Sequence, residues 1–186
     1  MTTHNNTPLS SLQPSEIKAL IGLGNPGPSY AYTPHNIGFL IVENLSSQFQ
    51  GSWTEHHNML LTNININDHQ LLLIKPQTFM NNSGEILKYL NKRGIKQDNI
   101  LIIHDEIDFP FGKITLKNCG SARGHNGLRS LIKYGGDKFL RLRVGVGRPE
   151  DANDVGNFVT TKFQQSSQEV NMLIDTSIAI IKKLFI

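Results

Sequence analysis

The stretch ALIGLGNPGPSY, residues 19–30, joins a short apolar run to a turn that is rich in glycine and proline. Its glycines have the spacing of the dinucleotide-binding fingerprint, in which a helix begins inside the motif and holds a pyrophosphate at its N-terminus. Such a helix is not expected here, because Pro26, Pro28 and Pro34 push the residues before them out of the helical region. The stretch therefore predicts a buried strand followed by a stiff loop, with no nucleotide cofactor.

Apolar runs alternate with helical patterns along the rest of the chain. Strands are expected over residues 18–23, 58–66, 70–75, 99–104, 114–117 and 141–146. Helical patterns lie between or after them, over residues 37–49, 82–90, 126–132 and 170–185. This alternation predicts an α/β fold with a single domain, in which helices cover both faces of a mixed, twisted sheet.

Asparagine is expected at the start of three of these helices. Asn36 is a good N-cap for the first, because its side chain is able to accept a hydrogen bond from a free backbone N–H group. Asn82 has Glu85 three residues later, which is the spacing of a capping box. Asn126 is expected to open the third helix.

Length and composition limit the class of protein. A chain of 186 residues fits one domain with a sizeable core. Residues 1–17 are polar and lack the layout of a signal or transit peptide, so we expect a mobile N-terminal extension before a folded domain at 18–186. The single cysteine, Cys119, excludes an intramolecular disulfide, and no apolar run is long enough to span a membrane. We therefore expect a cytoplasmic protein.

Charge is distributed unevenly along the chain. Residues 113–148 contain nine basic residues and one acidic residue, Asp137, which gives this segment a net charge of +8 within a chain of net charge +3. The rest of the chain is correspondingly acidic. Because phosphate contacts supply most of the sequence-independent affinity for nucleic acid, a basic segment of this kind favours a polyanionic partner.

Polar residues gather in five short segments near expected strand ends and helix starts. These are GNPG with Asn25, TPHN with His35, TFMNN with Asn81, HDEID with Asp105, and GHNG with His125 and Asn126. Each asparagine alone is more commonly a turn former. In an α/β sheet, however, a functional site normally lies in the loops beyond the strand ends, so the set together predicts a polar pocket.

Four long segments resemble the signature segments of bacterial-type peptidyl-tRNA hydrolase, in the same order along the chain. They read GLGNPGPSYAYTPHNIGF, KPQTFMNNSG, ILIIHDEIDFPFG and GSARGHNGLRSLI. The resemblance covers residues 18–186 and implies a catalytic domain that hydrolyses the ester between a peptide and the terminal ribose of tRNA, recycling tRNA from aborted translation. It also implies a monomer that binds the acceptor end and the 5′ phosphate of tRNA and works without a cofactor or a metal.

The resemblance implies roles for the polar residues of the pocket. His35 matches the general base that activates water, and Asp105 matches the carboxylate that orients His35. Ester hydrolysis at neutral pH needs such an activated water. Asn81 and Asn126 match substrate-positioning residues, because a side-chain amide donates hydrogen bonds without a titrating charge. Asn25 matches the residue that distinguishes an N-acylated peptide from a free α-amine.

Further residues match positions that contact tRNA. Tyr30 and Phe79 match aromatic residues near the acceptor end, where an unpaired nucleotide stacks or packs. Lys117 and Arg143 match a basic pair that holds the 5′ phosphate. Further candidates for the site are Met80, His125 and Arg123.

Two positions depart from the family pattern. Pro34 stands where arginine is usual, and it removes a charge next to His35 while stiffening the chain. Arg123 stands where glycine is usual, so it either restores a positive charge nearby or strains a loop that glycine would suit. We expect altered substrate affinity rather than lost chemistry.

Three alternative functions are left open by the residues themselves. A metallohydrolase would use His104, Asp105, Glu106 and Asp108 of HDEID, although no familiar ligand spacing is present. A cysteine hydrolase would use Cys119. A non-catalytic RNA-binding paralogue of the same fold would use the basic segment alone, without turnover.

Overall fold

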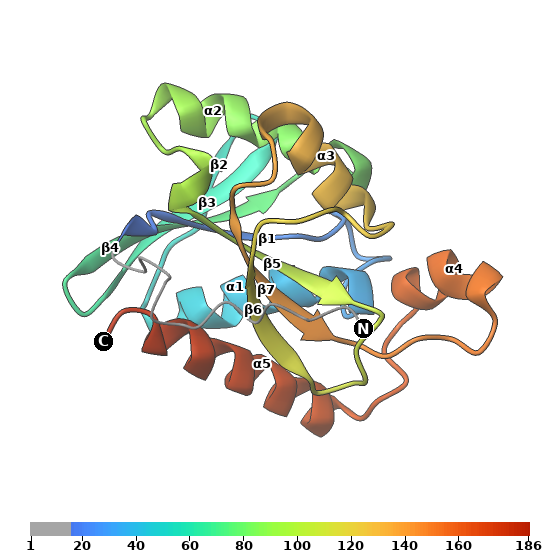
Figure 1. Cartoon of the computed structure of the whole chain (residues 1–186). Helices are drawn as coiled ribbons and strands as arrows, with labels where there is room; N and C mark the ends of the chain where they lie inside the picture. The colour runs from blue at the N-terminus through green and yellow to red at the C-terminus, as the bar shows by residue number, and fades with distance from the viewer. Residues whose placement is uncertain (1–15) are drawn as a thin grey trace, which may run out of the picture.

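A computed structural model describes residues 16–186 of the chain (Figure 1). The expected mobile extension at 1–17 therefore lies almost entirely outside the described residues. Ile17, which was assigned to that extension, is 5% exposed and packs in the core.

The described residues form a seven-stranded mixed sheet in the order β2–β3–β4–β1–β5–β7–β6. The four central strands, β4, β1, β5 and β7, are parallel to one another, and the remaining neighbours pair antiparallel. The bounds are β1 Ala19–Gly22, β2 Thr54–His56, β3 Met59–Ile66, β4 His69–Pro76, β5 Ile100–Glu106, β6 Ile114–Asn118 and β7 Leu140–Gly145. All six predicted strands are confirmed, and the short strand β2 was not predicted.

The central strands are buried on both faces, and their side chains alternate between two core clusters. Leu20 of β1 and Leu101 of β5 pack in one cluster, whereas Ile21 and Ile102 pack in the other. This alternation follows from the period of two along a strand. A strand covered on both sides reads as a continuous apolar run, which is why 18–23 and 99–104 were recognisable.

Helices cover both faces of the sheet, as the sequence predicts (Figure 1). Helices α1 (Ile37–Gln48) and α5 (Ser167–Lys183) pack together on one face. Helices α2 (Leu87–Lys92) and α3 (Asn126–Gly135) lie on the other. Helix α4 (Val155–Thr160) projects beside the carboxyl end of the sheet and was not predicted. No helix in residues 16–186 combines the length and the apolar character needed to cross a membrane.

Two of the predicted helix starts are wrong in detail. The helix expected to begin at Asn82 begins earlier, as the 3-10 helix η4 (Met80–Ile86), and Asn82 and Glu85 form no capping box there. Asn36 does precede α1 and ends the 3-10 helix η3 (Pro34–Asn36), but its side chain makes no capping hydrogen bond. Both differences arise because distant residues hold these segments, as described below for the site.

Gly22 and Gly24 of the opening stretch pack against α1. A Cβ atom on Gly22 would lie 2.3 Å from the backbone oxygen of Gly38, and one on Gly24 would lie 2.6 Å from the ring of Phe39. Gly38 is equally confined, because its Cβ would lie 2.4 Å from the oxygen of Ile103. Strand β1 and helix α1 therefore approach closely at these positions, which gives Gly22 and Gly24 a packing role, whereas Gly27 adopts a positive φ of 100° in open space.

Candidate active site

The carboxyl ends of the parallel strands surround a cavity of about 630 Å³. The loop after β1, the segment after β4, the end of β5 and the start of α3 all contribute to it. Every predicted site residue except Tyr30 lines this cavity: Asn25, His35, Phe79, Met80, Asn81, Asp105, Lys117, Arg123, His125, Asn126 and Arg143. Five segments that are distant in the sequence thus form one polar pocket.

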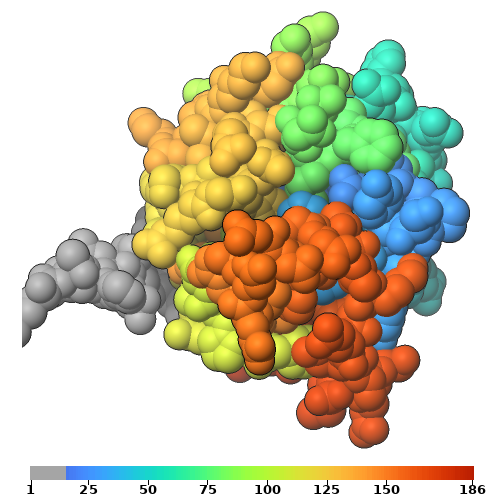
Figure 2. Space-filling view, turned by 90° about the vertical axis from the view of Figure 1, so that its right-hand side faces the viewer, coloured from blue at the N-terminus to red at the C-terminus, as the bar shows by residue number. Residues whose placement is uncertain are grey.

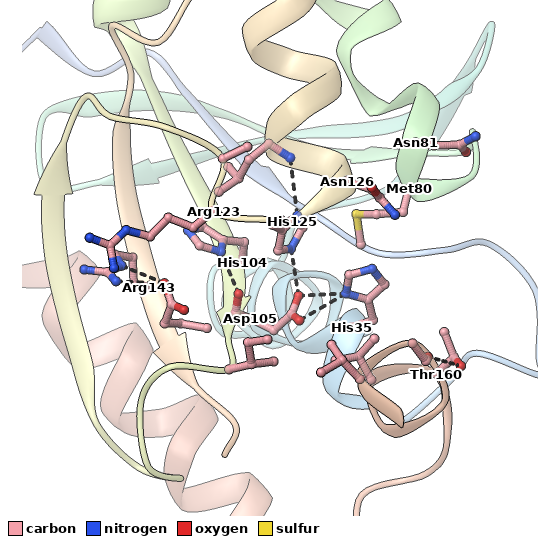
Figure 3. A pocket seen from close by; sticks show the side chains of 18 of the residues that line it. His35, Met80, Asn81, His104, Asp105, Arg123, His125, Asn126, Arg143 and Thr160 are labelled. Carbon is pink, nitrogen blue, oxygen red and sulfur yellow. Dashed lines mark hydrogen bonds and ion pairs between the residues drawn. The ribbon is translucent and has the colours of Figure 1, made fainter. Parts of the chain in front are cut away.

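His35 and Asp105 form a hydrogen-bonded pair at the centre of the cavity (Figure 3). Nδ1 of His35 lies 3.0 and 3.1 Å from the two carboxylate oxygens of Asp105. His35 is held on η3, whose first residue is Pro34; proline suits this position because its missing N–H would have no partner there. The substitution expected to stiffen the approach to His35 therefore fits the local backbone.

His125 holds the same carboxylate, and its ring lies beside that of His35, with centroids 5.0 Å apart. Its Nε2 lies 2.9 Å from Oδ1 of Asp105, while its Nδ1 accepts hydrogen bonds from the backbone N–H groups of Gly127 and Leu128 at the start of α3. Because Nδ1 accepts, Nε2 must carry the proton and donate to Asp105. The N-terminus of α3 therefore fixes the tautomer of His125.

Asp105 is buried and remains ionised. Burial opposes its ionisation, but the charges and hydrogen bonds of His35 and His125 outweigh this cost and hold the pKa of Asp105 well below its usual 3.8. A carboxylate only accepts, so His35 must donate through Nδ1, and its Nε2 keeps a free lone pair. Burial lowers the pKa of His35, yet the charge and hydrogen bond of Asp105 raise it overall above the usual 6.5.

His104 lies behind this group and stays neutral. Burial, together with the nearby His125, lowers the pKa of His104 to about 3, even though Asp105 opposes this effect. Its Nδ1 lies 2.7 Å from the backbone oxygen of Asp105, to which it donates. A neutral ring at this position supports the end of β5 without adding a charge that would compete for the Asp105 carboxylate.

Asn36 fixes the loop that carries Asn25. Its Oδ1 accepts from the backbone N–H of Asn25 at 2.8 Å, and its Nδ2 donates to the backbone oxygen of Asn25 at 2.9 Å. The side-chain Oδ1 of Asn25 in turn accepts from the N–H of Met80 at 2.7 Å. This bond orients the Asn25 amide, and it explains why η4 begins at Met80 rather than at Asn82.

Asn81 and Asn126 present exposed amides at the rim of the cavity. Oδ1 of Asn126 accepts a hydrogen bond from Arg129 at 2.8 Å. Phe79 is 56% exposed and meets the edge of Tyr30, with ring centroids 6.2 Å apart. Tyr30, which does not line the cavity, thus joins the site through Phe79.

Basic side chains line the other side of the cavity, across Asp105 from His35 (Figure 3). Arg143 donates from Nε and from one terminal nitrogen to the same Glu106 oxygen, at 2.9 and 2.8 Å. Lys117 forms no ion pair with any of residues 16–186. Partial burial lowers the pKa of Lys117, and the nearby charges of Arg143 and Arg123 lower it further. The two predicted clamp residues are therefore adjacent, but Glu106 already neutralises one of them.

Arg123 adopts a φ of 44°, in the left-handed region that favours glycine. The loop around it contains three more residues with positive φ: Cys119, Gly120 and Gly124. The strain expected for arginine at this position thus has a geometric basis. Its side chain is 56% exposed and lines the cavity, where its guanidinium lies 3.9 Å from a carboxylate oxygen of Asp108.

The residues of HDEID are not arranged as a metal site. Arg143 pairs with Glu106, and Arg148 pairs with Asp108 at 3.0 Å, so both acids already have cationic partners. In the described part of the chain, the ligand-spaced group is His35, Asp105 and His125. Its two histidines meet the carboxylate through protonated nitrogens, and a metal would require those nitrogens to be free. Cys119 does not line the cavity.

Two parts of the site were missed by sequence reasoning. Residues 155–160 contribute Val155, Gly156, Val159 and Thr160 to the cavity, and this segment lies between the loop after β1 and the segment around 110–130 (Figure 2). Helix α4 spans only 6 residues, too few for a periodic apolar pattern. The role of Asn36 was also missed, although its place in TPHN, next to His35, was a signal.

The chain is similar to known proteins over most of its length. The family model described as peptidyl-tRNA hydrolase matches residues 19–185. A peptidyl-tRNA hydrolase of Fervidobacterium nodosum is 42% identical over 151 residues, which cover 81% of this chain and 79% of that protein. One from Wolbachia pipientis is 44% identical and covers 77% and 80%. The crystal structure of peptidyl-tRNA hydrolase from Acinetobacter baumannii superposes with a TM-score of 0.83 at 36% identity, covering 92% of this chain and 88% of that one.

Proposed function

We propose that this chain, which belongs to the peptidyl-tRNA hydrolase family and hydrolyses the ester bond of peptidyl-tRNA, does so with His35 as the general base. The observation that supports this role is the free Nε2 of His35, which follows from the hydrogen bond between its Nδ1 and the ionised Asp105. Histidine is the side chain whose usual pKa lies closest to neutral pH, so it is suited to take a proton from water.

The reaction then proceeds in two proton transfers. Nε2 of His35 removes a proton from water as the water oxygen attacks the ester carbonyl carbon. The resulting imidazolium is stabilised by Asp105 and returns the proton to the ribose oxygen as the ester bond breaks. The products are a peptide with a free carboxyl group and tRNA with a free terminal hydroxyl. General-base catalysis of this kind contributes about 10²- to 10⁴-fold.

Asn81 and Asn126 are proposed to position the ester and to stabilise the negative charge that develops on its carbonyl oxygen. Their exposed amides lie at the rim of the cavity that contains His35. A well-placed amide donor is worth about 3 kcal/mol in a transition state of this type. Arg129 fixes the oxygen of Asn126, which leaves the Nδ2 group as the donor for substrate.

Asn25 is proposed to select substrates that carry an N-acyl group. Because its Oδ1 accepts from the N–H of Met80, its Nδ2 group is the part of the amide available to substrate. An N–H donor bonds well to the carbonyl oxygen of a peptide group. A free α-ammonium group is itself an N–H donor, so it does not bond to the Nδ2 group of Asn25. Its charge would also be desolvated in the site.

The basic side of the cavity is proposed to bind the 5′ phosphate of tRNA. Lys117 is the stronger candidate, because Arg143 is already paired with Glu106. Phe79 and Tyr30 are proposed to pack against the unpaired acceptor end, as aromatic side chains do with single-stranded nucleotides. We infer a monomeric enzyme, as the resemblance to the family implies, and we place it in the cytoplasm, where its substrate is made.

The proposal is tested with His35→Ala and with His69→Ala as a matched control. His69 lies on β4 and packs against Phe185, outside the cavity. Each variant is incubated with N-acyl-aminoacyl-tRNA and with unblocked aminoacyl-tRNA, and released tRNA is measured. We expect His35→Ala to lose at least about 100-fold in kcat while still binding tRNA, and His69→Ala to keep its activity. Undiminished cleavage by His35→Ala would contradict the mechanism and favour a different catalytic group. If the unsubstituted chain binds tRNA without cleaving either substrate, it is instead a non-catalytic RNA-binding paralogue.

A further inference from the structure

A second groove, of about 550 Å³, lies between α2, the end of α3 and the turn that joins β2 to β3. Its lining has no residue in common with the catalytic cavity. The residues that line it are His57, Asn58, Met59, Glu85, Ile86, Lys88, Tyr89, Lys92 and Tyr134. Helices α2 and α3 lie side by side on the same face of the sheet (Figure 1), so they form two walls of this groove.

The groove combines an apolar floor with basic and aromatic walls. Met59 and Ile86 are buried at its base, while Lys88 and Lys92 are exposed. Neither lysine forms an ion pair within residues 16–186. Glu85 is the one carboxylate among the lining residues, so the groove favours a ligand with net negative charge.

The aromatic residues of the groove are already held by neighbouring side chains. Tyr89 contacts the guanidinium of Arg93, 4.6 Å from its ring centroid, and the ring of His56, with centroids 4.8 Å apart. Tyr134 is 39% exposed, and Nζ of Lys88 lies 5.4 Å from its ring centroid. Aromatic rings whose orientation is already fixed lose little conformational entropy when they bind apolar or aromatic side chains.

The groove and the catalytic cavity are connected by two adjacent elements. Helix α3 begins at Asn126 in the cavity and reaches Tyr134 in the groove, and η4 runs from Met80 in the cavity to Ile86 in the groove. These elements pack closely, since a Cβ on Gly84 would lie 2.4 Å from the oxygen of Ser130. Eight residues of α-helix span about 12 Å. An extended peptide rises about 3.3 Å per residue, so about four residues cover this distance.

We infer that this groove binds the upstream part of the substrate's peptide, at about the fifth to seventh residues from the ester, and that it prefers acidic and aromatic side chains there. The inference rests on the proposed function, which places the peptide beside Asn25 and Asn81 and the tRNA phosphate beside Lys117. In Figure 3, Asn81 and Asn126 lie on the opposite side of the site from Arg143. Asn25, which is proposed to contact the peptide, accepts from the N–H of Met80 at the start of η4, and η4 ends at Ile86 in the groove, which favours the peptide as its occupant.

The test compares three substrates on the same tRNA. One carries a single N-acetylated amino acid, which is too short to reach the groove. Two carry N-acetylated eight-residue peptides that differ only at the fifth to seventh residues from the ester, with acidic and aromatic residues in one and lysines in the other. We expect the acidic peptide to have a KM about three- to tenfold lower than the lysine peptide, because two exposed lysines each contribute modestly.

Lys92→Glu identifies the groove as the source of this preference, and Lys183→Glu is its control. Both are exposed lysines in the last turn of a helix, so both changes reverse the same charge in the same backbone setting. We expect Lys92→Glu to abolish or reverse the ratio of the two KM values. Lys183→Glu, on the far face of the sheet, should leave the ratio intact.

Each result separates the possible explanations. If the unsubstituted enzyme cleaves none of the three substrates, the proposed function fails. Equal KM values for the acidic and lysine peptides, in an enzyme that cleaves the short substrate, overturn the groove as a peptide site. An equal rise in KM for all three substrates in Lys92→Glu also overturns it, because RNA would then be the ligand that the lysine attracts.

Discussion

Replacing Asp105 with asparagine should remove activity through the tautomer of His35 as well as through lost charge. In the structure, the Asp105 carboxylate accepts from His35 at 3.0 and 3.1 Å and from His125 at 2.9 Å. An asparagine side chain offers only one acceptor oxygen, and its other end is an N–H₂ donor. With the amide oxygen at the Oδ1 position, which both histidines contact, the N–H₂ group takes the Oδ2 position, 3.1 Å from Nδ1 of His35.

His125 is expected to keep that oxygen. Its Nδ1 accepts from the N–H groups of Gly127 and Leu128, so its Nε2 has no alternative but to donate. The N–H₂ group of Asn at 105 then faces His35 and forces Nδ1 to accept. The proton moves to Nε2 of His35, which is the atom that must act as the base.

The loss expected for Asp105→Asn is therefore about 10³- to 10⁴-fold in kcat. The upper value is the size of the effect when the aspartate of a serine-protease triad is replaced by asparagine and the histidine takes the wrong tautomer. The lower value lies within the usual contribution of general-base catalysis. The assay is release of tRNA from N-acyl-aminoacyl-tRNA under single-turnover conditions, which isolates the chemical step.

A second substitution tests the tautomer argument directly. In the double variant Asp105→Asn, His125→Asn, no histidine competes for the amide oxygen, and asparagine still suits the N-cap of α3. The amide is then free to turn its oxygen towards His35, so the double variant should be faster than Asp105→Asn alone. A double variant that is slower still, or an Asp105→Asn enzyme with nearly full activity, would refute the reasoning.

Three further predictions concern pH, stability and metals. The value of kcat/KM should fall as the pH drops through the raised pKa of His35, with a midpoint above 6.5, because only neutral His35 accepts a proton; a pH profile checks this, and a midpoint below 6.5 contradicts it. Asn36→Ala should lower the free energy of unfolding by about 1–3 kcal/mol in urea, because the buried backbone N–H and C=O of Asn25 lose their partner. The control Asn44→Ala removes one exposed bond to Leu40 and should change stability by less than about 0.5 kcal/mol. Treatment with EDTA should leave activity unchanged, because the histidines meet Asp105 through protonated nitrogens, and lost activity that zinc restores would show that a metal is needed.

Much of the fold was predictable because its signals are local. The apolar runs of β1 and β5 are continuous, since both faces of these strands are buried, and the amphipathic pattern of α5 follows from its single buried face. The strand β2 and helix α4 escaped prediction because each is short, with 3 and 6 residues respectively. Periodic burial, which makes an element recognisable, is absent from both.

The residues of the candidate site could be predicted from the sequence, but the hydrogen bonds and ion pairs between them could not. His35 and Asp105 were identified from the sequence, and the structure brings them together although they are 70 residues apart. Asn36 was expected to cap a helix and instead holds Asn25, 11 residues away. Arg143 was expected to hold the 5′ phosphate together with Lys117, and only the structure shows that it is paired with Glu106.

The sequence by itself determined which elements form and which polar residues follow them, because strand and helix periodicity and turn chemistry depend on near neighbours. Only the tertiary structure decided which nitrogen of His35 is free and how the Asn25 amide is oriented. These states are set by hydrogen bonds from Asp105 and Met80, which are distant along the chain and adjacent only after the sheet has assembled. Gly22 and Gly24 illustrate the same division, since their spacing is visible in the sequence but α1, the partner they accommodate, is seen only in the fold.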